Sequence, residues 1–294
     1  MNILAPLFDA LPSALGAAAI APSLLILWTV ATMDNRREPA RVVLIAFLLG
    51  AASAWLISYL NMPVPGVARL GDAPVLHAFL QATLGVAAPE EALKLIVLVF
   101  FCSRYIAYDH PMEGVVYGAA VGLGFAAYEN LFYLASNPDY WRTLAVVRGL
   151  FTVPVHGALG VIIGIYAVKA RFGTVTAETR RSGFRTTSYL TGWLIATVLH
   201  GLFDFPLLLQ RQLAATESAA TGWWLTLGFV VCGLVTLIAA RIIYRARRSQ
   251  APVHNSFTHS ERFQSHPWRV TAIVSLVLFL AALPLLGFLR EFMV

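Results

Sequence analysis

Eight apolar runs, each long enough to cross a lipid bilayer as a helix, dominate this chain of 294 residues. The runs are Leu15–Met33, Val42–Leu60, Pro74–Ser103, Gly114–Ala135, Leu144–Val168, Thr186–Leu209, Ala219–Ala240 and Val270–Leu289. About 20 apolar residues span the hydrocarbon core as a helix, whereas strands of membrane barrels alternate over about ten residues. Lipid offers no partners to backbone groups, so continuous runs predict helices. We therefore predict an all-α, polytopic integral membrane helix bundle of about eight transmembrane helices.

Composition and loop length favour one membrane domain. Hydrophobic residues make up 59% of the chain and charged residues only 12%, about half the charged share of soluble domains. The connections between the runs are short, so we expect a single domain over residues 1–294 and no separate soluble module.

The positive charges predict the orientation of this domain. The net charge is +6, and most Lys and Arg residues lie in the first, third, fifth and seventh connections between the runs. Cytoplasmic loops carry such an excess, so these connections are expected in the cytoplasm, with both termini outside. Topology thus explains the basic balance, and no nucleic-acid partner is expected.

Charged residues and histidines lie deep inside only four of the runs, where each charge costs about 2.5–3.5 kcal/mol even on lenient insertion scales. They are Glu90, Glu91 and Lys94 in the third run, Glu129 in the fourth, His156 in the fifth, and His200 and Asp204 in the sixth. A rise of about 1.5 Å per residue gives them overlapping depths, so they can meet in one layer between the midplane and the outer surface. The site is therefore expected on helices within about 74–209, with flanking helices at 15–60 and 219–289.

Spacing favours convergence of these side chains on one centre. Lys94 follows Glu90 by four residues and Glu91 by three, so it can share a helix face with either. His200 and Asp204 are also four residues apart. Pro89 removes a backbone N–H beside the glutamates and is expected to bend the helix there. Adjacent carboxylates in a low dielectric repel each other, a situation suited to acid–base chemistry.

Each residue also has an ordinary structural explanation. His156 alone could form an interhelical hydrogen bond, and Asp204 could be wetted near the outer boundary. Glu129 could pair with Arg148 across a short outer connection, and Lys94 could serve to neutralise one glutamate. The combination of all these groups in one layer is what favours a functional site.

The same residues resemble the motifs of the PrsW family of intramembrane proteases, which is related to the CAAX prenyl protease/Abi superfamily. EEALK at 90–94 resembles its EExxK motif, FAAYE at 125–129 resembles FxxxE, His156 matches the third motif, and HGLFD at 200–204 resembles HxxxD. The resemblance covers about Leu76 to Leu209. It implies an endopeptidase of the bacterial cytoplasmic membrane that cuts a single-span protein, such as an anti-sigma factor, near or within the bilayer.

The resemblance leaves two mechanisms open. In one, His156, His200, Asp204 and Glu129 provide the ligands of a zinc ion (Zn²⁺), and Glu90 or Glu91 acts on water. In the other, no metal is bound, a glutamate takes the proton from water, and the histidines stabilise the oxyanion. The sequence does not separate these mechanisms.

A proton- or cation-coupled membrane transporter is the alternative function, because buried Glu, His and Asp also form proton relays. Many transporters show paired helix interruptions in two repeats, and no such pair is found in this sequence. The substrate, its cut site and the oligomeric state are not predictable from the sequence.

Overall fold

A computed structural model describes residues 13–35, 38–60, 73–102, 111–172, 182–215 and 223–250, in which every regular element is a helix. The elements are α2 (Ser13–Thr32), α3 (Ala40–Leu60), α4 (Pro74–Leu80), η2 (Gln81–Ala87), α5 (Ala88–Val97), η3 (Leu98–Cys102), α7 (Pro111–Ala135), α8 (Trp141–Leu150), α9 (Thr152–Phe172), α10 (Ser182–Ala215) and α11 (Trp223–Arg248). The segments η2 and η3 are π-helical. The predicted all-α class is confirmed for the described residues.

Six of the predicted spans correspond to helices that are long and apolar enough to cross a membrane, namely α2, α3, α7, α8 with α9, α10 and α11. The predicted count of eight is not confirmed. The third predicted span is helical from Pro74 to Cys102, but it is divided into short α- and π-helical segments. The eighth, Val270–Leu289, lies outside the described residues, as do the two termini whose external location was predicted.

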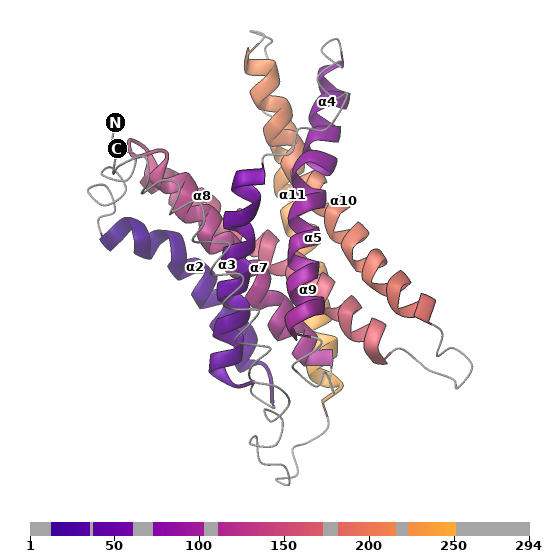
Figure 1. The fold of residues 1–294 in the computed structure, drawn as a ribbon. Helices are drawn as coiled ribbons and strands as arrows, with labels where there is room; N and C mark the ends of the chain where they lie inside the picture. Colours follow the sequence, from indigo (N-terminus) through magenta and orange to yellow (C-terminus); the bar gives the residue numbers. More distant parts are fainter. Residues whose placement is uncertain are drawn as a thin grey trace, which may run out of the picture.

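Helix α7 lies at the centre of the bundle (Figure 1), with α2, α3, α9 and α11 packed around it. Every residue of α7 from Met112 to Ala127 is buried. The outer helices instead expose large apolar side chains, such as Trp28 on α2 and Leu237 on α11. A helix that is apolar all round belongs in a core, and apolar side chains on the outside of such a bundle are suited to lipid.

Glycines allow α7 and α9 to touch backbone to backbone. A Cβ atom on Gly118 would lie 2.2 Å from the Gly160 carbonyl oxygen, and a Cβ atom on Gly122 would lie 2.2 Å from the His156 carbonyl oxygen. Membrane helices use small residues in this way, because close backbone contact replaces the hydrophobic driving force. The contact holds His156 against α7, about two turns before Glu129.

The third helical run changes its packing partner along its length. Its first two segments, α4 and η2, pack against α10, whereas α5 also packs against α3 (Figure 1). The π-helical segment ends just before Pro89, and the Ala88 N–H donates to the Thr83 carbonyl, five residues earlier. Proline has no N–H to continue the α-helical pattern, and the structure has a π-helical segment immediately before it.

The fifth predicted span also differs from a single helix. Leu144–Val168 is divided at Phe151, where α8 ends and α9 begins one residue later. This break brings the last turn of α8, with Arg148, beside the end of α7 that carries Glu129.

Candidate active site

The seven predicted site residues form one connected polar cluster among α5, α7, α9 and α10. Glu90, Glu91 and Lys94 come from α5, Glu129 from α7, His156 from α9, and His200 and Asp204 from α10. Hydrogen bonds or ion pairs link every member to another member. Four separate helices therefore bring these side chains together, in agreement with the convergence predicted from the sequence.

Lys94 is fully buried and directs its ammonium group at three partners. Nζ lies 2.7 Å from Glu91 Oε1, 2.9 Å from His156 Nδ1 and 4.1 Å from the centre of the Phe125 ring. An ammonium group has three donors and no acceptor, so His156 Nδ1 accepts a hydrogen bond and the ring proton resides on Nε2. Of the two glutamates that the spacing left open, Lys94 pairs with Glu91.

Glu129 joins His156 to an arginine on α8. His156 Nε2 lies 2.8 Å from Glu129 Oε2, and Arg148 Nη2 lies 3.1 Å from the same oxygen. Arg148 Nε also donates to Asn130 Oδ1 at 2.8 Å. The Glu129–Arg148 pair considered in the sequence analysis is present, and it also belongs to the site, since Glu129 holds a site histidine. The sequence signal for Arg148 was a lone charge near the start of an apolar run.

His200 lies among three carboxylates. Its Nδ1 is 2.8 Å from Glu91 Oε1, and its Nε2 is 3.2 Å from Asp204 Oδ2 and 3.9 Å from Glu90 Oε2. The pairing of His200 with Asp204 follows the four-residue spacing of the motif. A Cβ atom on Gly201 would lie 2.6 Å from a side-chain oxygen of η2, so the absence of a side chain there lets α10 approach the π-helical segment.

Four side chains converge closely enough to hold one metal ion. One ligand atom from each of Glu90, Glu91, His156 and His200 lies within 4.8 Å of the others. Glu90 Oε2 and Glu91 Oε2 are buried and have no hydrogen-bond partner within the described part of the chain. A buried carboxylate oxygen without a partner is unfavourable unless a donor or a cation satisfies it. The residues present therefore fit a metal ion.

Glu129 and Asp204, which the sequence analysis predicted as metal ligands, lie beside this group of four. Each contacts the Nε2 atom of one histidine, Glu129 that of His156 and Asp204 that of His200. Histidines that bind metals commonly donate their other ring N–H to a carboxylate, which fixes the tautomer and the ring orientation. This arrangement is also suited to an orienting role for both carboxylates.

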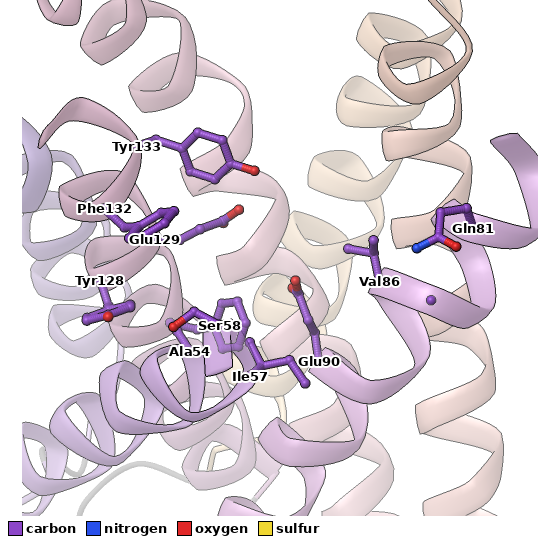
Figure 2. A pocket seen from close by; sticks show the side chains of 12 residues that line it. Ala54, Ile57, Ser58, Gln81, Val86, Glu90, Tyr128, Glu129, Phe132 and Tyr133 are labelled. Atoms are coloured by element: carbon purple, nitrogen blue, oxygen red, sulfur yellow. The ribbon is translucent and has the colours of Figure 1, made fainter. Parts of the chain in front are cut away.

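A cavity of about 280 Å³ reaches Glu90 between α3, η2 and α7. Its lining consists of Ala54, Ile57 and Ser58 from α3, Gln81, Gly85 and Val86 from η2, Glu90 from α5, and Phe125, Tyr128, Glu129, Phe132 and Tyr133 from α7. Figure 2 shows the Glu90 carboxylate directed into the space between Glu129 and Val86. Glu91 does not line this cavity, so the two adjacent glutamates have different surroundings.

The fold and the cluster together define a class of multi-pass membrane proteins with buried acid–base and metal-ligand groups. Residues 38–239 match the family profile described as "PrsW family intramembrane metalloprotease". Because this match covers more than half of the chain, the chain belongs to the PrsW family of intramembrane metalloproteases. The resemblance seen in the motifs is thereby confirmed.

Relatives named Protease PrsW agree with this assignment. The Geobacillus kaustophilus protein is 33% identical over 196 residues, which cover 66% of this chain and 80% of the relative. The Bacillus subtilis protein is 33% identical over 189 residues, covering 64% and 80%, and the Oceanobacillus iheyensis protein is 29% identical over 188 residues, also covering 64% and 80%. No solved structure matched the chain significantly.

These findings make the chain a bacterial multi-pass membrane protein and an intramembrane protease. An intramembrane protease acts on a membrane-embedded substrate in contact with lipid. Membership of a protease family favours this enzyme over the transporter considered as the alternative.

Proposed function

We propose that this enzyme cuts a single-span membrane protein, such as an anti-sigma factor, at a peptide bond near or within the bilayer. One observation carries the proposal most directly: Glu90 belongs to the group of possible metal ligands, has a buried carboxylate oxygen without a hydrogen bond, and also lines a cavity. A peptide that enters the cavity would therefore meet the acid–base group and the metal-binding group together. The anti-sigma-factor class of substrate follows from the family resemblance.

Glu90 is the general base in this proposal. Because it lines the cavity, water and a peptide bond can reach its carboxylate, which takes a proton from the attacking water and passes it to the leaving amine. Glu91 is enclosed, and a single oxygen of it accepts hydrogen bonds from both Lys94 and His200. These contacts suit a fixed ligand better than a group that exchanges protons with substrate.

Glu91, His156 and His200 are the proposed ligands of a zinc ion. To bind it through their Nδ1 atoms, His156 would give up its hydrogen bond from Lys94 and His200 its hydrogen bond to Glu91, while their Nε2 atoms keep their carboxylate partners. Catalytic zinc sites use three protein ligands and keep a further position open, and these three residues with Glu90 form the convergent group. When bound there, zinc supplies Lewis-acid polarisation of the scissile carbonyl.

Glu129 and Asp204 orient the two histidines in this proposal, and Arg148 neutralises Glu129 and fixes its position. Carboxylate partners of this kind keep a histidine ring in one tautomer and one orientation. In the ligand set predicted from the sequence, Glu129 and Asp204 bind the metal themselves. That set stays a prediction, and the metal-content measurements described next distinguish it from the set proposed here.

Elemental analysis of detergent-purified protein, combined with cleavage of purified single-span substrates, tests the roles of the four convergent residues. We expect about one zinc ion per chain. Glu91→Gln, His156→Ala and His200→Ala should lose both metal and activity. Glu90→Gln should keep the metal and lose activity, because it retains the shape of the side chain but removes the base.

The alternatives predict different results in the same experiment. Loss of metal from Glu129→Gln and Asp204→Asn, with retention in Glu91→Gln, would favour the ligand set predicted from the sequence. Full cleavage by a sample shown to be free of metal would overturn the zinc assignment and favour glutamate catalysis without a metal. Wild-type cleavage rates in both Glu90→Gln and Glu91→Gln would exclude the glutamate pair from catalysis.

A further inference from the structure

The cavity that reaches Glu90 lies where two parts of the bundle diverge. Helix α5 packs against α3, but η2 and α4 pack against α10, so the third helical run leads away from α3. Helices α3 and α7 form one wall of the resulting space and η2 forms the other (Figure 2). We name this space, bounded by the residues listed above for the cavity, the α3–η2 cleft.

Apolar side chains flank the opening of the cleft. Phe132 and Tyr133 on α7 line the cleft and are 51% and 41% exposed. Large exposed side chains of this kind on a membrane helix are suited to contact with lipid. The cleft therefore opens toward the side of the bundle, where a membrane-embedded polypeptide would approach.

The inner walls combine apolar surface with hydrogen-bonding groups. The Gln81 side chain lies against Gly85, where a Cβ atom would be only 2.5 Å from its Nε2 atom. On the opposite wall, Ser58 Oγ donates to the Trp55 carbonyl at 2.6 Å, and its oxygen can still accept a hydrogen bond. The cleft thus offers an amide and a hydroxyl group among apolar and aromatic side chains.

Peptide hydrolysis in a bilayer requires this combination. The bond to be cut must leave the helical conformation so that water can reach its carbonyl carbon. Each backbone group exposed by this unwinding costs several kcal/mol in lipid unless it finds a partner. A cavity of about 280 Å³ lies at the small end of the range for ligand pockets, which suits one side chain with adjoining backbone rather than an intact helix.

We propose that the α3–η2 cleft is the substrate subsite. It admits an unwound stretch of a membrane-embedded polypeptide from the lipid side and holds one apolar side chain next to the scissile bond. Gln81 and Ser58 form hydrogen bonds with the substrate backbone. The proposal rests on the proteolytic function and adds to it the route of entry and the residues that determine specificity.

Narrowing the cleft tests its role in specificity. Ile57→Phe and Ile57→Trp enlarge one residue of the α3 wall that lies outside the catalytic cluster and has no proposed hydrogen bond to the substrate. Leu48→Phe is the matched control, because Leu48 is exposed on the same helix and does not line the cleft. With a substrate that carries a large apolar residue at the cut site, we expect the wall variants to lower kcat/KM by about 10- to 200-fold. Zinc content and melting temperature should not change, and replacing that substrate residue with alanine should restore cleavage.

Photo-crosslinking tests entry of the substrate independently of turnover. A crosslinking residue at position 58, in a chain that also carries Glu90→Gln, should capture the substrate, whereas the same residue at position 48 should not. Capture of another segment of this same chain would overturn the proposal, because the cleft would then be filled by the enzyme itself.

The outcomes separate this proposal from the proteolytic function on which it rests. If the wall variants cleave every substrate at the rate of Leu48→Phe, the subsite is overturned and the protease remains. If no single-span protein is cleaved by the unsubstituted chain and none is captured at position 58, both proposals fail. Gln81→Leu, which removes the amide, should lower kcat/KM for large and small substrate residues alike, and a selective loss would assign Gln81 to side-chain recognition instead.

Discussion

Replacing Lys94 with methionine is expected to destabilise the bundle strongly. Methionine keeps the length and the apolar stem of the side chain but removes the ammonium group that contacts Glu91, His156 and the ring of Phe125. Glu91 Oε1 would then keep only His200 as a partner, and its other carboxylate oxygen already has no hydrogen bond. The variant would therefore bury a carboxylate without its counter-charge.

The expected loss follows from the burial of this pair, since both side chains are 0% exposed. Removing one partner of a buried ion pair typically costs about 3–5 kcal/mol. The cation–π contact with Phe125 is worth up to about 2 kcal/mol when desolvated, but it uses the same ammonium group, so the two losses do not add. A loss of about 3–5 kcal/mol is a large share of the roughly 5–15 kcal/mol that stabilises a typical protein.

The free energy of unfolding in mixed micelles of detergent and SDS, followed by circular dichroism, measures this loss. Lys169→Met is the matched control, because Lys169 is exposed on α9 and has one aromatic contact, 4.4 Å from the Tyr166 ring. Its change should stay within about 1 kcal/mol. The double variant Lys94→Met/Glu91→Gln should be more stable than the sum of the single changes predicts, because neither charge is left alone.

Equal unfolding free energies for Lys94→Met and Lys169→Met would refute this reasoning, since the Lys94 ammonium would then have to reach water or lipid headgroups. Strict additivity in the double variant would show that Lys94 and Glu91 do not interact in the folded protein.

Three further predictions concern activity and packing. Glu90→Gln and Glu91→Gln should both abolish cleavage, but Glu91→Gln should lower the melting temperature more, because only Glu91 pairs with the buried lysine; cleavage assays and thermal melts of the two variants decide this. Gly118→Ala should lower the melting temperature, because its Cβ atom would lie 2.2 Å from a carbonyl oxygen of α9, whereas Gly233→Ala meets no described atom within 4 Å and should be neutral or stabilising by up to about 1 kcal/mol. Arg148→Met should reduce kcat by about 10- to 100-fold with a smaller change in KM, because it loosens the partner of a site histidine; partial recovery in Arg148→Lys is expected, and equal activity of all three forms would exclude Arg148 from the site.

The helices and the polar cluster were predictable because both depend on local features of the sequence. Apolar length alone indicates spans such as α7 and α10, and a four-residue spacing places His200 and Asp204 on one helix face. The convergence of the polar side chains was predictable from their similar depth in the membrane. Charged groups inside membrane helices face the interior of the bundle, where they pair with one another.

The interruptions of the helices were only partly predictable, because they depend on tertiary packing. Pro89 indicated a bend in the helix, but the π-helical form of η2 also reflects its packing against α10. Hydropathy gives no sign of the break at Phe151, because it lies inside an apolar run, but Pro154 in the first turn of α9 is a sequence signal for a helix start there.

Which charged side chains pair with each other within the site was also not predictable from the sequence. Glu90 and Glu91 flank Lys94 around the helix axis, at about 40° and 60° from it, so the spacing alone does not decide which of them pairs with the lysine. The rotation of α5 about its own axis, relative to α9 and α10, decides which glutamate pairs with the lysine. In this orientation Glu91 contacts Lys94 and His200, and Glu90 lines the cavity.

The π-helical segment η2 makes the chain between residues 81 and 87 tolerant of losing one residue. A π-helix joins residues five apart instead of four, so deletion of one residue there would restore an ordinary α-helix. The π-helical turn holds about one residue more than an α-helical turn, so losing that residue and returning to α-helical geometry largely offset each other in their effect on the rotation of α4 relative to α5. Ala78 would therefore stay packed with Phe205 and Leu209 of α10, and the glutamates would keep their place. A deletion in α5 instead has no extra residue to remove and would rotate the two sides of the cut by about 100° relative to each other. A one-residue gap between residues 81 and 87 in an alignment of related chains would thus be compatible with the same contact between α4 and α10 and the same catalytic motif.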